Sequence, residues 1–192
     1  MSTSSSSSAN GQVSDLPPQR RFITTHDSNT KAIATAEDFK WQPYDNKNMG
    51  FSVVYTTSEF PANLNAEKDI EAHKTVMSGN GPGLVNPGGT VLRCVDFAPG
   101  YRCAMHRTQS LDYGIVLDGE IDMVLDSGEV HHMNAGDVAV QRATNHQWLN
   151  RSDKKWARMM FVLQDCQALK VGGQTLGEDL GTAGEFLPPS GN

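Results

Sequence analysis

Residues 100–119 read GYRCAMHRTQSLDYGIVLDG, and residues 136–150 read GDVAVQRATNHQWLN. Each stretch combines one histidine, His106 or His146, with a short segment rich in β-branched and aromatic residues and bounded by glycine. Residues two apart in a strand share a face, so His146 and Trp148 are expected to point the same way. The two stretches therefore predict strands that carry histidines on an inward face.

The rest of the chain has the punctuation of an all-β protein. Asp118-Gly119 is typical of a two-residue hairpin turn, and no segment of ten or more residues between strands has helical periodicity, which argues against a doubly wound fold. Short strands with turns at this spacing predict one antiparallel sandwich or barrel. The predicted strands are 22–25, 51–56, 90–97, 110–117, 120–125, 129–133, 138–141, 146–150 and 157–163, with one short helix at 69–77.

The first stretch resembles cupin motif 1, G-x5-H-x-H-x3-E-x6-G. Gly100, His106 and Gly119 are in register with the motif. Thr108 stands where the second histidine is usual, and Asp112 stands where the glutamate is usual. The resemblance thus implies a cupin site that has lost one imidazole and shortened its acid.

The second stretch is similar to cupin motif 2, G-x5-P-x-G-x2-H-x3-N. Gly136, His146 and Asn150 match, whereas Arg142 replaces the proline and the loop before the histidine is one residue shorter. The combined resemblance, to small single-domain cupins of fungi and bacteria, implies a single-cupin antiparallel β-barrel, jelly-roll-like, with an N-terminal extension. Some of those proteins belong to secondary-metabolite pathways.

The domain organisation follows from composition. Residues 1–19 are Ser-rich and lack bulky apolar groups, so we expect a disordered tail. Residues 20–84 are expected to be an extension that packs on the barrel or swaps strands with it. The barrel is predicted at 85–165, followed by a C-terminal segment at 166–192 whose end is disordered.

Charge and composition limit the partners. The 192 residues carry a formal net charge of −6 and no basic cluster, which argues against nucleic-acid binding. The Ser-rich N-terminus is unlike a secretory signal, and no apolar run is long enough to cross a membrane. We therefore expect a cytoplasmic protein with a small-molecule substrate. A homodimer is predicted, with residues 22–25 or 51–56 pairing across subunits.

The candidate site allows two kinds of chemistry. His106, Asp112 and His146 would form a two-histidine, one-carboxylate set suited to Fe, Zn or Mn, although the neutral hydroxyl of Thr108 is a poor replacement for an imidazole ligand. In the metal-free alternative, one neutral histidine takes a proton beside a carbonyl, and the other histidine or Tyr113 returns one. Asp112 would then hold a histidine tautomer or stabilise its cation.

Several further side chains are predicted to bind substrate. Gln141 and Arg142 could hold a carboxylate or enolate, although a surface ion pair explains Arg142 equally well. Trp148 offers a flat apolar wall, or simply packs in the core. The full set of expected substrate-binding residues is Trp148, Arg142, Gln141, Thr108, Arg158 and Met160.

Three functions are compatible with this set. The leading hypothesis is a lyase or isomerase that dehydrates, decarboxylates or isomerises a carbonyl-containing, polyketide-like substrate with His106 and His146. The second is an Fe(II)-dependent dioxygenase. The third is a non-catalytic small-molecule binding module, because a fold alone does not determine a reaction.

Overall fold

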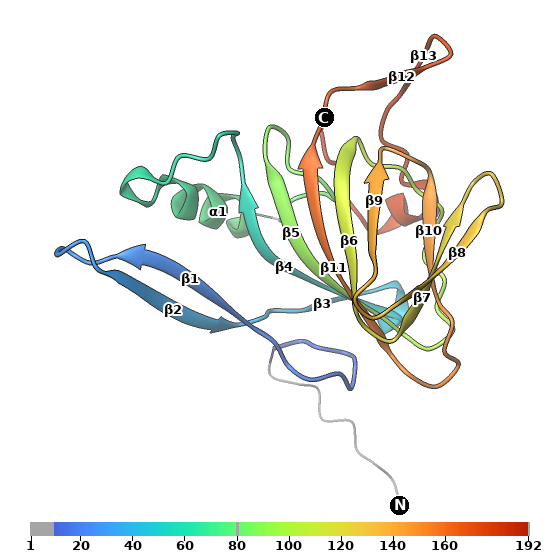
Figure 1. Ribbon diagram of the computed structural model, residues 1–192, viewed down its shortest axis with the longest axis horizontal. Coiled ribbons are helices and arrows are strands. Elements are labelled where there is room, and N and C mark those ends of the chain that lie inside the picture. The colour runs from blue at the N-terminus through green and yellow to red at the C-terminus, as the bar shows by residue number, and fades with distance from the viewer. Residues whose placement is uncertain (1–9, 80, 192) are drawn as a thin grey trace, which may run out of the picture.

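The computed structural model describes residues 10–79 and 81–191 of the chain. Antiparallel strands are the main regular structure of these residues (Figure 1). The helix is α1 (Lys68–Ser78), and the strands are β1 (Arg20–His26), β2 (Ala32–Asp38), β3 (Gln42–Tyr44), β4 (Met49–Thr57), β5 (Thr90–Phe97), β6 (Ser110–Asp118), β7 (Glu120–Leu125), β8 (Val130–Asn134), β9 (Val138–Arg142), β10 (His146–Asn150), β11 (Ala157–Asp165), β12 (Leu169–Val171) and β13 (Gln174–Leu176).

Two sheets form the barrel. The larger one has six strands in the order β3-β4-β5-β11-β6-β9, and the smaller one has the order β10-β7-β8. In Figure 1 the strands of the smaller sheet lie beyond β9. Side chains of the two sheets, such as Trp148 of β10 and Phe161 of β11, meet in a shared interior. This is the all-β, jelly-roll-like arrangement that the turn spacing predicts.

A segment without regular strand geometry extends the smaller sheet. Residues 102–107 run antiparallel to β10, with isolated bridges that join Arg102 to Leu149 and His106 to His146. The backbone N–H of Cys103 also donates to the Trp148 carbonyl at 3.0 Å. This pairing places the segment around His106 beside the segment around His146.

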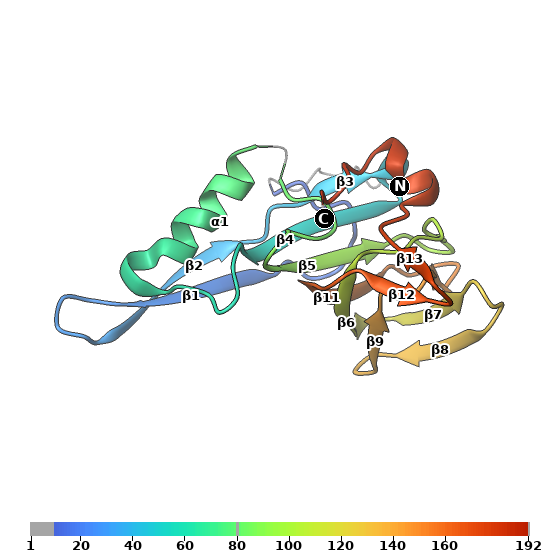
Figure 2. The same cartoon turned by 90° about the horizontal axis from the view of Figure 1, so that it is seen from above.

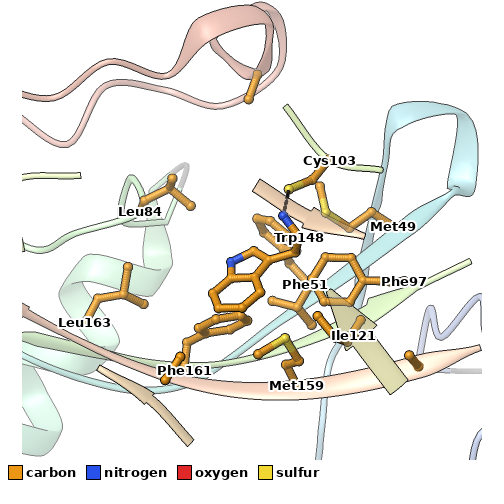
Figure 3. Packing of buried hydrophobic residues seen from close by; sticks show 14 of the residues in the cluster. Met49, Phe51, Leu84, Phe97, Cys103, Ile121, Trp148, Met159, Phe161 and Leu163 are labelled. Carbon is orange, nitrogen blue, oxygen red and sulfur yellow. Dashed lines mark hydrogen bonds between the residues drawn. The ribbon is translucent and has the colours of Figure 1, made fainter. Parts of the chain in front are cut away.

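The apolar core lies between the two sheets. Trp148 and Ile121 come from the smaller sheet, and they pack toward Phe97, Met159 and Phe161 of the larger one (Figure 3). Side chains alternate between the two faces of a strand, so the barrel strands contribute about every second residue to this interior, apart from the irregularities at Val53/Tyr55 and Arg158/Met159. The interior is therefore a mixed aromatic and aliphatic core with few polar side chains.

Two glycines permit close approaches within the barrel. Gly119 sits in the β6–β7 turn with φ of +78°, and a Cβ there would meet the Cβ of Ala157 at 2.9 Å. Gly114 lies beneath Phe161, whose ring would be 2.9 Å from an added Cβ. Any larger residue at either place would force the neighbouring strand β11 outward.

The N-terminal extension covers the outer face of the larger sheet. Hairpin β1–β2 projects beyond the barrel, and α1 runs beside β4 (Figures 1 and 2). Residues 10–19, which the sequence predicts to be disordered, make specific contacts here. Ser14 donates a hydrogen bond to Asp96, and the Pro17 carbonyl accepts one from Arg158 at 2.7 Å. Residues 1–9 lie outside the described residues.

The predicted strands and the helix are confirmed, with ends that differ by a few residues at most. The sequence missed β2, β3, β12 and β13. Strand β2 reads AIATAED and is exposed throughout, so only its pairing with β1 makes it a strand. No helix among the described residues has the length and apolarity needed to cross a membrane.

The structure leaves the predicted cross-subunit pairing through residues 51–56 open. That segment lies within β4, which pairs with β5 along its length and with β3 only at Met49–Phe51. On the β3 side, residues 52–56 have no strand partner among the described residues, so this pairing stays a prediction. Residues 22–25 lie in β1, which pairs with β2 within the same chain, and the homodimer stays a prediction.

Candidate functional site

The two motif histidines meet inside the barrel. The N–H of each donates to the carbonyl of the other at 2.9 Å, so His106 and His146 form a directly opposed antiparallel pair. Opposed residues place their side chains on the same face. The ring centroids are 4.4 Å apart, and the His146 ring lies edge-on to Trp148 at 5.4 Å. Backbone pairing alone thus explains why residues forty positions apart converge.

Each imidazole is fixed by its own turn. His106 Nδ1 lies 2.9 Å from the Ala104 carbonyl, and His146 Nδ1 lies 2.9 Å from the Thr144 carbonyl. A carbonyl only accepts, so Nδ1 carries the proton in both rings. Nε2 of each neutral ring is then a free lone pair, suited to take a proton or to bind a cation.

Burial keeps both rings neutral. Desolvation lowers the pKa of His106 below its ordinary value, and the nearby Ala104 carbonyl and Glu178 oppose this only in part. Desolvation, followed by repulsion from His106, lowers the pKa of His146 to about 3. Because protonation of one ring opposes protonation of the other, the pair holds at most one extra proton near neutral pH.

The histidines line a largely apolar cavity of about 60 Å³. Its polar wall is made by His106, His146, Asp112 and Arg93. The remaining wall is contributed by aromatic and aliphatic side chains of both sheets and by the C-terminal segment, namely Met49, Phe51, Leu84, Val95, Phe97, Tyr101, Cys103, Ala104, Trp148, Phe161, Leu163, Ala183, Phe186 and Leu187.

This inner cavity is small because the C-terminal segment closes it. A short 3-10 helix, Gly181–Glu185, buries Ala183, and Leu187 follows it into the interior. Pockets for drug-sized ligands are about 300–1,000 Å³. A substrate of that size therefore requires that residues 183–187 move, or that part of it occupies the larger outer cavity of about 740 Å³ that shares Phe186 and Leu187.

Asp112 is a buried carboxyl with spare hydrogen-bonding capacity. Its Oδ2 accepts from Thr108 Oγ1 at 3.3 Å, and Thr108 in turn accepts from Ser110 at 2.7 Å. Its Oδ1 is buried without a partner. Desolvation outweighs the Ser110 and Thr108 hydroxyls and raises the pKa of Asp112 to about 6. The side chain is thus poised to gain or lose a proton near neutral pH.

Replacing Asp112 should stabilise the protein above pH 6. The folded pKa of about 6 exceeds the unfolded value of roughly 3.9, so folding takes up a proton between these pH values and stability falls as pH rises through them. We expect Asp112→Asn to raise the free energy of unfolding by about 1–3 kcal/mol near pH 7.5 and by much less near pH 4.

Urea unfolding of wild type and variant at both pH values measures this. Asp153→Asn, an exposed loop substitution, is the control and should change neither value. An Asp112→Asn variant that is destabilised by the same amount at both pH values would show that the effect does not depend on ionisation, and would contradict a raised pKa at this position.

The donor set does not fit the predicted three-ligand metal centre. The described residues contain no group of three His, Cys, Asp or Glu side chains placed to share one ion. Asp112 lies on β6 of the larger sheet, whereas His106 and His146 are held together at the smaller sheet. The ring centroids of the two imidazoles are 4.4 Å apart, but the structure does not bring Asp112 to them as a third ligand.

Two of the expected site residues lie outside the cavity because of strand alternation. Tyr113 follows Asp112 in β6 and is 39% exposed on the opposite face. Arg142, at the end of β9, is also exposed and lines none of the cavity. Neighbouring residues of a strand face opposite sides, so neither side chain reaches the histidines.

Arg158 and Met160 likewise belong to the outer face of β11. Arg158 forms a buried ion pair with Asp96, with Nε–Oδ1 of 2.6 Å, and its guanidinium lies 4.9 Å from the Trp41 ring centroid. Met160 packs against the separate outer cluster that includes Trp41. The expectation that these residues line the cavity is wrong, because β11 turns Met159 and Phe161 inward instead.

The other expected residues are buried, with different surroundings. Trp148 lines the cavity and also packs on Phe161 with a centroid distance of 5.5 Å, so it is both wall and core. Thr108 reaches the site through its bond to Asp112. Gln141 is buried but is engaged by Thr144 and by Met123 away from the cavity wall.

Sequence reasoning missed Arg93. It lies in the middle of β5, whose sequence TVLRCVDF is apolar apart from Thr90, Arg93 and Asp96. Residues 91, 93, 95 and 97 share a face by alternation. A single basic residue among three apolar ones on that face is the pattern in the sequence that could have indicated a buried arginine at the site.

The comparison with known proteins gives the class. Residues 93–163 match the model of the cupin domain family. Relatives at about 40% identity extend that match over most of the chain, and one of them is named a cupin-domain-containing oxidoreductase. The chain belongs to the cupin family.

The relatives come from fungi. Phomopsin biosynthesis cluster protein D of Diaporthe leptostromiformis is 41% identical over 188 residues, which span 96% of this chain and 98% of that protein. The cupin-domain-containing oxidoreductase fogC of Aspergillus ruber is 40% identical and covers 84% of this chain and 80% of its own length. The oryzines biosynthesis cluster protein J of Aspergillus oryzae is 39% identical over 87% of this chain and 94% of that protein.

Among solved structures, the polyketide cyclase RemF of Streptomyces resistomycificus matches 69% of this chain and 70% of its own with a TM-score of 0.41 and 13% identity. That likeness concerns the fold and carries no information about substrate.

Proposed function

We propose that the protein is a biosynthetic cupin enzyme that moves protons on a small carbonyl-containing substrate, as an isomerase or lyase does. The observation that carries this proposal is the pair of free Nε2 lone pairs, on neutral rings 4.4 Å apart, in one cavity with a titratable carboxyl. The names of the fungal relatives support a role in a biosynthetic pathway.

The proposed step is removal of a proton from a carbon next to the carbonyl. Nε2 of His106 takes the proton. The ring of His146 is the weaker base, because burial and the neighbouring His106 lower its pKa to about 3. The C–H electron pair moves into an enolate. Repulsion between the two rings prevents both from charging at once, so the proton is readily passed on.

The second half of the step returns a proton. In an isomerisation, Asp112 or His106 delivers it to a different carbon of the enolate. In a dehydration, the same proton goes to a departing hydroxyl, which leaves as water. With its pKa raised to about 6, Asp112 can gain and release a proton near neutral pH, and it takes the donor role first assigned to Tyr113.

Solvent deuterium exchange tests this proposal directly. We expect the protein, treated with a chelator and dialysed into D2O, to catalyse exchange of carbon-bound hydrogen in at least one member of a panel of β-keto acids and hydroxyketones. Proton NMR follows the loss of each signal against a protein-free control. A panel in which no signal exchanges faster than the control contradicts the proposal.

An oxidoreductase is the second candidate, because the relatives fogC, virC and srdB are named cupin-domain-containing oxidoreductases. Two histidines without a placed third ligand do not make the iron site that the dioxygenase hypothesis needs. Iron analysis of freshly purified protein, together with oxygen uptake after Fe(II) addition, decides between the candidates. Stoichiometric iron and substrate-dependent uptake would favour the oxidoreductase.

A further inference from the structure

Arg93 is a charged side chain built into the wall of the cavity. It projects from the centre of β5 among Val91, Val95 and Phe97, and only 3% of its surface is exposed. It lines both the inner cavity and the outer one. A guanidinium almost never sits in an apolar interior without a partner, because the cost of removing its charge from water is high.

The contacts of Arg93 leave that charge incompletely compensated. Its Nη2 donates to the Gly83 carbonyl at 2.6 Å, and its guanidinium carbon lies 4.9 Å from the Phe51 ring centroid. Its Nε is buried without a hydrogen-bond partner. Among the described residues no carboxylate lies within 4.0 Å of it; Tyr44, and to a smaller extent Asp112, favour its charged form without an ion pair.

Arg158 shows what a fully paired arginine looks like in the same sheet. It too is 3% exposed, but its Nε and Nη2 donate to the two oxygens of Asp96 at 2.6 and 2.7 Å, and its Nη1 donates to the Pro17 carbonyl. Burial lowers the pKa of Arg93 to about 10, whereas the Asp96 carboxylate holds the pKa of Arg158 above its ordinary value. One arginine has its anion within the fold and the other does not.

We propose that Arg93 is the anion-binding residue of the cavity and that the substrate of the proposed enzyme carries a carboxylate, or an acidic enol that ionises. The guanidinium of Arg93 lines both cavities and can donate a charge-assisted bond to a carboxylate oxygen, and a hydroxyl of the same molecule can donate to the carboxyl of Asp112, which lines the inner cavity. The inference rests on the proposed function only in taking the cavity as the substrate site.

The rest of the ligand is expected to be apolar and flat. Phe51, Phe186 and Leu187 line both the inner and the outer cavity, as Arg93 does. A ligand whose acid group reaches Arg93 therefore places its body against these side chains. We infer an aromatic or unsaturated acid as the substrate class.

Calorimetry with matched acids and amides tests this inference. The probes are benzoate, salicylate, sorbate and cinnamate, each paired with its amide, titrated at about pH 7.5 into wild-type protein. We expect at least one acid to bind about tenfold or more tightly than its amide, because only the acid gains a charge-assisted bond to Arg93. Equal binding of every acid and its amide, or binding of none of them, overturns the inference.

Variants assign the effect to Arg93. Arg93→Met keeps the volume and removes the charge, and it should abolish the preference for acid over amide, while Arg93→Lys should keep part of it. The control Arg142→Met removes an exposed charge and should preserve the preference. If Arg93→Met is too unstable to titrate, the comparison is between wild type and Arg93→Lys, in which the preference for acid over amide should be reduced. A preference that survives in Arg93→Met contradicts the inference.

The test of acid binding and the test of the proposed function can fail independently of each other. Binding of acids needs no proton transfer, so the preference should persist in His106→Gln and His146→Gln even when they no longer catalyse deuterium exchange. An acid preference in a wild-type protein that catalyses no exchange would contradict the proposed chemistry and support the Arg93 site. Catalysed exchange without an acid preference would support the proposed chemistry and contradict the Arg93 site.

Discussion

His106→Ala should lower the rate of deuterium exchange, or of turnover, by about 10²–10⁴-fold, the usual contribution of a positioned acid or base. The reason is local: His106 supplies the more basic of the two free Nε2 atoms. His146→Ala should also be severely impaired, because that ring limits the pair to one proton and packs against Trp148. The double variant should be no slower than the worse single variant, since the two rings act as a unit.

A histidine outside the site provides the matched control. His131 lies on β8 and is exposed, and His131→Ala should retain full activity. Circular dichroism and thermal unfolding of each variant separate a loss of chemistry from a loss of structure. Full activity in folded His106→Ala and His146→Ala would remove both residues from the mechanism.

Arg158→Met should cost about 3–5 kcal/mol of unfolding free energy, which is the usual result of removing one partner from a buried ion pair. Both side chains are almost fully buried, at 3% and 0% exposure, and the pair is bidentate. The variant leaves the Asp96 carboxylate with Ser14 as its remaining named partner. It also frees the Pro17 carbonyl, so residues 10–19 should become accessible to limited proteolysis.

Denaturant unfolding measures the loss, and Arg142→Met is the control, with an expected change within about 0.5 kcal/mol for an exposed residue. At a temperature where Arg158→Met is folded, it should bind the acid probes and turn over substrate normally. A stable variant with lost activity would instead return Arg158 to the substrate-binding role that the sequence suggested.

The fold and the histidine pair were predictable because each rests on a short-range signal. Turn residues such as Asp118-Gly119 bound the strands, and strand bounds such as those of β7 and β10 follow from local composition. The motif spacing then identified His106 and His146 as partners. Their convergence depends only on antiparallel pairing of residues 102–107 with β10.

The residues wrongly assigned to the site lie in strands, where the inward direction of one side chain fixes the outward direction of the next. Asp112 and Tyr113 were both assigned to the site, although adjacent strand residues cannot share a face. The same rule places Arg158 and Met160 outside once Met159 is inside. Strand β2 could not be predicted because its Ala-rich sequence has no buried side chain, and its partner β1 alone defines it.

The role of Arg93 needed the structure for a different reason. Sequence alone shows a basic residue in an apolar strand, and that pattern fits either a paired structural arginine or a ligand-binding one. Only the placement of Asp96 decides between them, since it pairs with Arg158 on the outer face and leaves Arg93 without a carboxylate inside.

The most direct test of the account is the protonation state of the two imidazoles. Long-range proton–nitrogen NMR of ¹⁵N-labelled, chelator-treated protein near pH 7 reports which ring nitrogen carries the proton, and His106→Gln and His146→Gln assign the signals. The account predicts two neutral rings, each protonated at Nδ1 with Nε2 bare. Protonation at Nε2 in either ring, or a charged imidazolium pair at that pH, would contradict it.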